Sequence, residues 1–498
     1  MEKARIKISK DFIIDKTDDR LFGSFVEHMG SVVHNGIFEP DHPTADNNGF
    51  RQDVLKYVDE LNLSVIRYPG GNYTSGYDWK KTIGPVKDRP TTLELAWRQI
   101  EPNTFGLNEF MIWAKRVNVE PIMTINLGTK GIEDAAEILE YCNFEKGTYW
   151  SDMRIQHGIK KPYNIKTWCL GNELDGDWQI AKKTAEDYGR LACEAAKVMR
   201  LIDPEIELVA VGSSARFLDS FPNWDMIVMM HTYEVVDYLS VHNYINKKDD
   251  DIGTYLARPI EMEKQINEVI AACDYVKGVK KTDKTMYLSF DEFNVHKEPE
   301  IDYIPWQTGY PFDWCQYNME DTLVFGSMLM TILRHADRIK IACQSLLVNT
   351  IPLILTVKGK SAWRNATYYP LQQVSKFGRG KVLRSSIVGP TYSVDFEENV
   401  QAIDQVVVLN KEEKTLAIFC INRMNEPIEV VVETKETILK ELIEHQVMTN
   451  QDLTICNTIE RQEAIVPSVQ EGTVVTKDEV TMNLQPYSWN MIRISVTG

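Results

Sequence analysis

Short apolar runs alternate with helical stretches from about residue 20 to about residue 350, and this alternation constrains the fold most strongly. The stretch Ala185–Leu201, for example, has the apolar spacing of an amphipathic helix. Strands that are nearly all apolar and alternate with helices indicate a parallel sheet covered on both faces. The eight runs are Leu21–Glu27, Ser64–Pro69, Pro121–Leu127, Ile165–Glu173, Glu207–Gly212, Tyr238–Tyr244, Thr285–Glu292 and Lys340–Asn349.

Eight such units within about 330 residues fit a (β/α)8 TIM barrel, which we expect over residues 17–380. A doubly wound sheet is the alternative. No Gly-x-Gly-x-x-Gly turn follows the first run, however, and that turn is typical of the doubly wound dinucleotide-binding fold. The α/β barrel is therefore the favoured fold class.

The sequence pattern changes after about residue 380. Short runs rich in Val, Ile and Thr there alternate polar and apolar residues. This pattern predicts a C-terminal antiparallel β-sandwich over residues 381–498. Helix-length periodicity is limited there to Lys435–His445. Residues 1–16 contain a similar alternation, Ala4–Lys10, and we expect them to add a strand to the sandwich. No long Pro/Gly linker separates the two parts, so we expect them to pack firmly.

Charge and cysteine usage exclude several classes of partner. The formal net charge of −17 argues against nucleic acid and anionic membranes. The N-terminal residues lack the apolar run of a signal peptide, and no 18-residue apolar stretch occurs. The eight cysteines include no Cys-x-x-Cys pair and no Cys/His cluster at zinc spacing. We therefore expect a cytoplasmic protein with reduced thiols and no metal.

Polar side chains collect where the expected barrel strands end. Catalytic groups of such barrels come from the C-terminal ends of several strands. Glu173 and Glu292 each end an apolar strand, where an unpaired carboxylate would be costly. Two carboxylates that face each other across a barrel suit glycoside hydrolysis. The other candidates at strand ends are Glu27, Arg67, Asn72, Asn172, His242 and Tyr244.

Neighbouring residues suggest different roles for the two glutamates. Asn172 precedes Glu173 and can reach a sugar hydroxyl, which favours Glu173 as the acid/base. Arg67 and Tyr244 are expected near Glu292, where they would keep it ionised as a nucleophile. Positions on the fourth and seventh strands favour the retaining separation of about 5 Å.

Several of these residues also have ordinary structural explanations. Taken singly, Glu27, Arg67 and His242 are compatible with purely structural roles. Gly70-Gly71 is not a phosphate loop, and we expect it to let the backbone turn tightly beside a ligand. Indole rings commonly stack on sugars, although packing within a loop or the core is the alternative for each. The tryptophans that follow barrel strands are Trp97, Trp306 and Trp314.

Separated blocks of sequence resemble the α-L-arabinofuranosidases of glycoside hydrolase family 51, a family of clan A barrels. The likeness covers nearly the whole chain, and the blocks occur in the family's order. They are Gly23–His28, Arg67–Tyr73, Ala96–Arg98, Ile100–Asn103, Lys166–Glu173, Ser289–Glu292 and His335–Arg338.

This resemblance implies a barrel with a β-sandwich, retaining chemistry, no metal or other cofactor, and a homo-oligomer, often a hexamer. It implies Glu173 as acid/base and Glu292 as nucleophile. Arg67 and His242 would support the nucleophile side. The residues that would hold the furanose are Glu27, Asn72, Asn172 and Tyr244, with Trp97 also expected to contact substrate.

Two positions depart from the family pattern. Leu346 stands where the family usually has a glutamine that would contact the sugar. Phe293–His296 replaces the frequent Trp-Asn-Val-Trp that follows the nucleophile. Losing a polar contact in a site built for hydroxyls can cost much affinity, so the pocket is expected to be retuned.

The leading hypothesis is an exo-acting enzyme that removes terminal non-reducing α-L-arabinofuranosyl residues from arabino- or arabinoxylo-oligosaccharides by double displacement. The alternative is a clan A β-glycosidase or endo-glycanase. A third reading is a carbohydrate-binding protein without catalysis, against which the retained Glu173, Glu292 and Asn172 speak.

Overall fold

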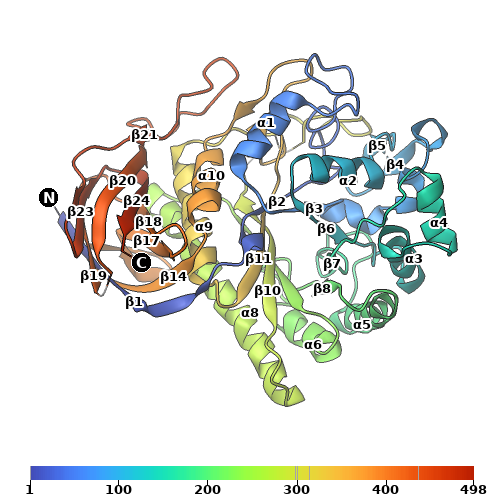
Figure 1. The fold of residues 1–498 in the computed structure, drawn as a ribbon, viewed down its shortest axis with the longest axis horizontal. Coiled ribbons are helices and arrows are strands. Elements are labelled where there is room, and N and C mark those ends of the chain that lie inside the picture. Colours follow the sequence, from blue (N-terminus) through green and yellow to red (C-terminus); the bar gives the residue numbers. More distant parts are fainter. Residues whose placement is uncertain (1, 298, 300, 313, 436, 498) are drawn as a thin grey trace.

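The computed structural model describes residues 2–297, 299, 301–312, 314–435 and 437–497. An α/β barrel lies beside a β-sheet domain, and both chain termini lie on the sheet domain (Figure 1). The barrel is closed in the order β10-β11-β2-β3-β6-β7-β8-β9, with every neighbouring pair parallel. Its strands are β2 (Gly23–Phe25), β3 (Val65–Tyr68), β6 (Glu120–Thr124), β7 (Thr167–Cys169), β8 (Glu207–Ala210), β9 (Tyr238–Ile245), β10 (Tyr287–Val295) and β11 (Ile339–Gln344).

Each of the eight apolar runs overlaps one barrel strand, so the predicted fold class is confirmed. The runs are apolar because barrel strands are covered by helices outside and by side chains inside. Among the helices of the described residues, none is both long enough and apolar enough to cross a membrane. The helices are α1 (Gln52–Leu61), α2 (Leu107–Arg116), α3 (Ile132–Asn143), α4 (Tyr149–Gln156), α5 (Ala185–Ile202), α6 (Asn223–Thr232), α7 (Ile252–Ala257), α8 (Pro259–Lys280), α9 (Met319–Arg334) and α10 (Tyr368–Phe377).

Short elements complete the loops at the strand ends. Single turns of 3-10 helix lie at Asp19–Leu21, Asn72–Gly76, Trp79–Thr82 and Val86–Asp88. Small antiparallel ladders pair β4 (Thr92–Glu94) with β5 (Gln99–Glu101), β12 (Ile354–Leu355) with β13 (Trp363–Arg364), and β15 (Thr391–Val394) with β16 (Glu397–Gln401).

The C-terminal sandwich is confirmed, with the N-terminal strand as part of it. Strand β1 pairs antiparallel with β14 but parallel with β19, so one pair departs from the antiparallel expectation. These pairings support the boundaries that we propose, 1–16, 17–380 and 381–498. The ten-stranded sheet contains β1 (Glu2–Lys16), β14 (Lys381–Val388), β17 (Ile403–Asn410), β18 (Thr415–Asn422), β19 (Ile428–Lys435), β20 (Leu439–Met448), β21 (Ser468–Val469), β22 (Val474–Val475), β23 (Glu479–Leu484) and β24 (Ser488–Val496).

The helical interpretation of Lys435–His445 is wrong. The described part of this segment includes the end of β19 and most of β20. Strand β20 pairs with β24 and has register shifts between Leu439 and Leu442 and again before Glu444. A β-bulge inserts an extra residue and breaks the two-residue alternation of a strand. The apolar spacing of three between Leu439 and Leu442 is therefore a property of a bulged strand here.

Helix α9 lies between the barrel and the sandwich and joins them. Ser327 and Arg334 of α9 both donate to the buried carboxylate of Asp404 on β17, with 2.8 Å from Arg334 Nη1 to Oδ1. A Cβ atom on Gly326 would lie 2.6 Å from the ring of Trp489 on β24. This close approach requires glycine. The two parts therefore pack directly against each other, as expected from the absence of a long Pro/Gly linker.

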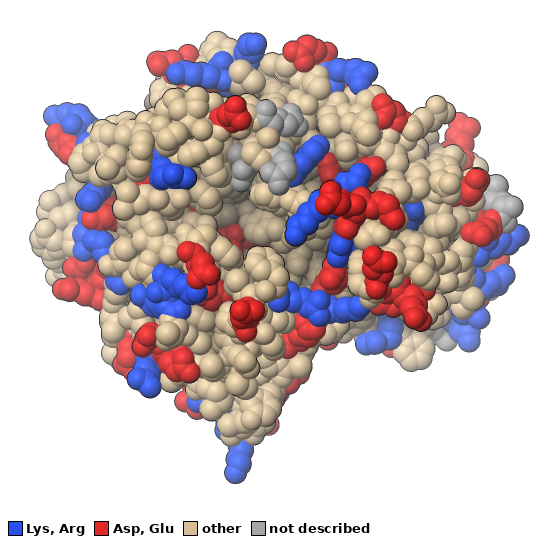
Figure 2. Space-filling model, turned by 180° about the vertical axis from the view of Figure 1, so that it is seen from behind, with Lys and Arg blue, Asp and Glu red and all other residues tan. Residues whose placement is uncertain are grey.

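Acidic and basic side chains are interspersed over the face in Figure 2, which is hollowed near its centre.

Candidate active site

Two buried glutamates meet at the C-terminal end of the barrel. Glu173 follows β7 in a left-handed backbone conformation, with φ of 46°, and Glu292 lies within β10. One carboxylate oxygen of each lies within 4.8 Å of the other and of a ring nitrogen of His242. This separation matches retaining glycosidases, whose carboxyl groups are about 5–5.5 Å apart, and is shorter than the separation of inverting enzymes.

The two carboxylate oxygens of Glu292 accept hydrogen bonds from a guanidinium and from a hydroxyl. Arg67 Nη1 donates to Oε1 of Glu292 over 2.6 Å, and the Tyr244 hydroxyl donates to Oε2 over 2.7 Å. Burial alone would lower the pKa of Arg67, but Asp291 and Glu292 raise it above its usual range. Burial and the charge of Glu292 raise the pKa of Tyr244 well above its usual range. Arg67 therefore stays charged, and Tyr244 stays a donor.

Glu173 has different hydrogen-bond partners from Glu292. Burial raises its pKa, and the charge of Glu292 adds to this effect, while a hydrogen bond from His242 opposes it. His242 Nδ1 lies 2.9 Å from Oε1, and Trp178 Nε1 donates to Oε2 over 2.6 Å. A carboxyl group with a raised pKa, beside a second carboxyl group that accepts from an arginine, is the arrangement in which the first acts as acid and the second as nucleophile.

His242 lies between the two glutamates rather than on the Glu292 side alone. Its Nδ1 is 3.6 Å from Oε2 of Glu292, and its Nε2 is 3.4 Å from Oδ1 of Asp291. Burial alone would lower the pKa of His242, but the charges of Glu292 and Asp291 raise it to about 10. The ring is therefore an imidazolium at neutral pH and offsets part of the negative charge of the site.

Asp291 is a buried residue of this site to which the sequence reasoning gave no role. Its Oδ2 lies 3.5 Å from Arg67 Nε, and its Oδ1 accepts a hydrogen bond of 2.5 Å from Ser240. Burial alone would raise the pKa of Asp291, but Arg67 and His242 lower it to about 2. The sequence signal for Asp291 was a charged residue in an apolar strand. That signal was attributed to the neighbouring Glu292 alone.

A second set of side chains lines the space beside the two glutamates. Asn172 connects this second set to the residues around Glu292. Its Oδ1 accepts a hydrogen bond from Arg67 Nη2 over 2.6 Å, and its Nδ2 donates to Asn72 Oδ1 over 2.9 Å. Gln179 also donates to Asn72 Oδ1, over 3.0 Å, and was not among the expected residues. These amides hold one another in fixed orientations at the strand ends.

Glu27 is held from two directions at the same oxygen. The backbone N–H of Tyr73 and the indole N–H of Trp97 each donate to Oε1 over 2.8 Å. A Cβ on Gly71 would lie 2.2 Å from Oε2, so the tight Gly70-Gly71 turn packs against Glu27, where a ligand had been expected. Burial, followed by the charge of Glu292, raises the pKa of Glu27 to about 8.

Three other positions singled out in the sequence are Trp306, Trp314 and Leu346. Trp306 is about half-exposed and its backbone N–H binds the carbonyl of Arg98 over 2.6 Å. Trp314 packs at 6.2 Å against the ring of Trp363. Leu346 is buried, and Gln344 donates to its carbonyl over 3.0 Å. An amide side chain is thus present on this strand, two residues before the expected position.

Comparisons with known proteins agree with this geometry. Residues 57–255 match the family model of the α-L-arabinofuranosidase 1 domain, and residues 291–488 match that of the α-L-arabinofuranosidase C-terminal domain. The chain is 46% identical to intracellular exo-α-(1→5)-L-arabinofuranosidase 1 of Bacillus subtilis, with 99% of each chain covered. It is 45% identical to an intracellular exo-α-(1→5)-L-arabinofuranosidase of Acetivibrio thermocellus, over 99% of this chain and 100% of the relative.

A solved structure extends the agreement to the fold. The family 51 α-L-arabinofuranosidase of Bifidobacterium longum superposes with a TM-score of 0.95 at 35% identity, covering 99% of this chain and 100% of that one. Two family models, relatives aligned along nearly their whole length and this superposition all lead to one assignment. The chain belongs to the family 51 α-L-arabinofuranosidases.

Proposed function

We propose that the protein is a retaining, exo-acting α-L-arabinofuranosidase that removes terminal non-reducing α-L-arabinofuranosyl residues from arabinose-containing oligosaccharides. The observation that carries the proposal is the pair Glu173 and Glu292, whose oxygens approach within 4.8 Å in opposed surroundings. The names of the two bacterial relatives favour α-1,5 linkages among the possible substrates.

In the first step Glu292 is the nucleophile and Glu173 the acid. A carboxylate oxygen of Glu292 forms a bond to the anomeric carbon, while the bond from that carbon to the leaving oxygen breaks. Glu173 gives its proton to the leaving oxygen. Arg67 and Tyr244 each donate a hydrogen bond to Glu292, and the two hydrogen bonds orient its carboxylate toward the sugar.

In the second step the roles of Glu173 reverse. Its carboxylate takes a proton from water as the water oxygen attacks the anomeric carbon, and the ester bond to Glu292 breaks. Two inversions at one carbon give net retention. His242 contacts both carboxyl groups, and its positive charge stabilises whichever of them is ionised in each step.

The polar set at the strand ends is proposed to bind the terminal furanose. Glu27, Asn72 and Asn172 present hydrogen-bonding atoms beside Glu292, and Trp97 covers Glu27. A cavity of about 900 Å³ begins at Glu173 and Trp178 and leads away over the loops after β8 and β9. This volume leaves room for the rest of an oligosaccharide on the leaving-group side, as an exo-acting enzyme needs.

The location and assembly of the protein are also proposals. We propose that it acts in the cytoplasm on imported oligosaccharides, which the word "intracellular" in the names of both relatives supports. We propose a homo-oligomer, with a hexamer as the form that sedimentation should reveal. A monomer at micromolar concentration would end that part of the proposal.

Azide rescue tests the roles of both glutamates. Glu173→Ala should still form the glycosyl-enzyme from an aryl arabinofuranoside with a good leaving group, and azide should then give the α-azide. Glu292→Ala should lose turnover, and azide should give the β-azide by direct displacement. The opposite product from either variant, followed by NMR, would reverse the assignment. A preference of the wild type for an aryl β-xyloside would overturn the proposed substrate.

A further inference from the structure

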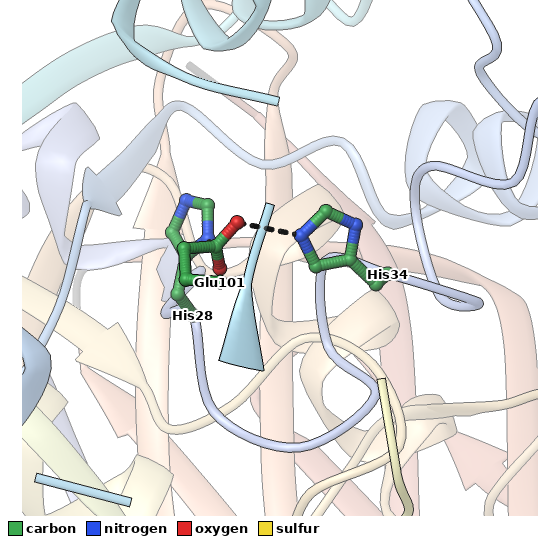
Figure 3. Close-up of side chains that lie close together, drawn as sticks. All are labelled: His28, His34 and Glu101. Atoms are coloured by element: carbon green, nitrogen blue, oxygen red, sulfur yellow. Dashed lines mark hydrogen bonds and ion pairs between the residues drawn. The ribbon is translucent and has the colours of Figure 1, made fainter. Parts of the chain in front are cut away.

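Two histidines and a glutamate lie together outside the catalytic centre. Figure 3 shows the carboxylate of Glu101 between the rings of His28 and His34. His28 Nδ1 lies 2.8 Å from Oε2 of Glu101, and His34 Nε2 lies 2.9 Å from Oε1. One donor atom from each of the three residues lies within 4.8 Å of the other two. The triad is defined here as His28, His34 and Glu101.

The surroundings fix two members of the triad in place. The other ring nitrogen of His28, Nε2, lies 2.9 Å from the hydroxyl of Tyr68, and the ring stacks on Tyr73 at 4.6 Å. The backbone N–H of Asn103 donates to Oε1 of Glu101 over 2.9 Å. Histidines that bind metals typically use one ring nitrogen for the ion and the other for such a partner.

The donor set is that of a transition-metal site. Two imidazole nitrogens and one carboxylate oxygen are ligands that Zn²⁺ prefers, and three protein ligands leave a fourth position for water. Neighbouring ligands around a tetrahedral zinc ion are about 3.3 Å apart. Each imidazole nitrogen therefore needs to move about 0.5 Å away from the carboxylate oxygen that it now contacts. His34 lies on the loop between β2 and α1 and can supply that movement.

A route from solvent reaches the triad. His34 borders a cavity of about 590 Å³, separate from the cavity that begins at Glu173. The carboxylates of Glu39, Asp41 and Glu109 line this cavity, together with one lysine, Lys358. Two of these carboxylates are paired with arginines, Glu39 with Arg51 at 3.0 Å and Glu109 with Arg89 at 2.9 Å, so Asp41 is the carboxylate of this lining that is left to attract cations.

We propose that the triad binds one divalent transition-metal ion, with Zn²⁺ as the first choice, and a water molecule from the adjoining cavity as fourth ligand. The ion ties together two segments that carry active-site residues. His28 directly follows Glu27, and Glu101 follows Trp97 by four positions on the β4–β5 segment. Binding stabilises these loops and takes no part in the bond-breaking steps.

The test begins with full-length protein stripped with EDTA. Titration with ZnCl₂ against a chromophoric chelator should give one equivalent with a dissociation constant below about 10 μM. At a hundredfold excess over that constant, the melting temperature should rise by about 2 °C. Co²⁺ should give the visible absorption of a four-coordinate site. Absence of any equivalent tighter than about 10 μM would overturn the proposal.

Variants locate the bound ion. His34→Phe should lose the equivalent, the cobalt spectrum and the thermal shift, while His42→Gln on the same loop should keep all three. Glu173, His242 and Glu292 form a second cluster that can attract metals. Glu173→Gln should therefore keep the equivalent, and its loss there would place the ion between the catalytic glutamates and refute the assignment.

A measurement on the wild type covers the case in which His34→Phe fails to fold. X-ray absorption at the zinc edge counts the imidazoles bound to the ion. The triad supplies two imidazoles, whereas the catalytic cluster supplies one. A spectrum fitted by a single imidazole would refute the proposal, and one fitted by two imidazoles and oxygen ligands would support it.

Discussion

Arg67 Nη1 lies 2.6 Å from Oε1 of Glu292, and both side chains are buried at the mouth of the barrel. The same guanidinium donates through Nη2 to Asn172 over 2.6 Å. One side chain thus orients the proposed nucleophile and an amide that is proposed to bind the sugar. A buried ion pair is costly to break from one side, because the remaining charge is left without a partner.

Arg67→Lys should therefore be a damaging substitution although it keeps the charge. A lysine ammonium is compact and cannot reproduce the fork that reaches Glu292 and Asn172 together. We expect kcat/KM to fall about 100-fold, as for the loss of a charge-assisted hydrogen bond. Steady-state kinetics on an aryl α-L-arabinofuranoside measure this, with Arg116→Lys on the surface as control. An unchanged kcat/KM would contradict the proposed role.

Tyr244→Phe removes the hydroxyl that donates to Glu292 over 2.7 Å and also approaches Ser345 Oγ at 2.7 Å. The loss of one hydrogen bond to a charged group predicts a fall in kcat of about 10- to 100-fold. Tyr238→Phe, at the other end of β9, removes a hydroxyl that donates to Glu207 over 2.8 Å far from the glutamates. Equal losses of kcat in the two variants would show that Tyr244 acts only through stability.

Asp291→Asn tests a positioning residue that touches Arg67, Ser240 and His242 rather than substrate. Removing its negative charge makes the site more positive, because Glu292 and Glu173 still raise the pKa of His242 and keep it an imidazolium. Both limbs of the pH profile of kcat/KM should then move to lower pH, with a fall of about 100-fold at the optimum. A lower rate with an unshifted profile would indicate a purely structural role.

The two catalytic candidates could be proposed from sequence because each closes an apolar run, where an unpaired charge would be costly. Arg67 was a candidate because it lies near the end of another apolar run. Strand position alone also placed Tyr244 near Glu292, and the structure shows their hydrogen bond. Trp178 and Gln179 lie in the loop after Glu173, and loop paths depend on contacts with distant segments. No periodicity signals such contacts, so these residues were not predicted.

Dependence on segments distant in sequence also explains why the helical interpretation of Lys435–His445 was wrong. In β20 the register shifts place Leu439 and Leu442 three residues apart, and this spacing arises from pairing with β24, which is distant in sequence. Local pattern cannot separate a bulged strand from one helical turn. This ambiguity did not affect the barrel strands. Helices and interior side chains bury both of their faces, so their sequences are continuous apolar runs.

Gly71→Ala should disturb the proposed furanose pocket. The added Cβ would lie 2.2 Å from Oε2 of Glu27, so the carboxylate or the turn must move. We expect KM to rise about tenfold and the melting temperature to fall by several degrees, as overpacking typically costs about 1–3 kcal/mol. Gly131→Ala is the matched control, because no atom beyond its neighbours along the chain lies within 4 Å of its added Cβ. A KM unchanged in both variants would remove Glu27 from the pocket.

Glu27→Gln isolates the effect of one buried proton on stability. The pKa of Glu27 is raised from 4.5 to about 8, so between these values the folded protein holds a proton that the unfolded chain has lost. Stability from this proton is fully present below about pH 4.5 and is lost as the pH rises through about 8. Glutamine keeps the carbonyl oxygen that accepts from Tyr73 and Trp97 but cannot ionise.

The melting temperature of Glu27→Gln should therefore rise relative to the wild type as the pH increases from 5.5 to 9. The direction follows because only the wild type must bury a carboxylate at the alkaline end. Glu412→Gln on the surface should show a constant difference from the wild type over the same range. A constant difference for Glu27→Gln as well would mean that Glu27 is already ionised at neutral pH, and that the furanose meets a charged acceptor there.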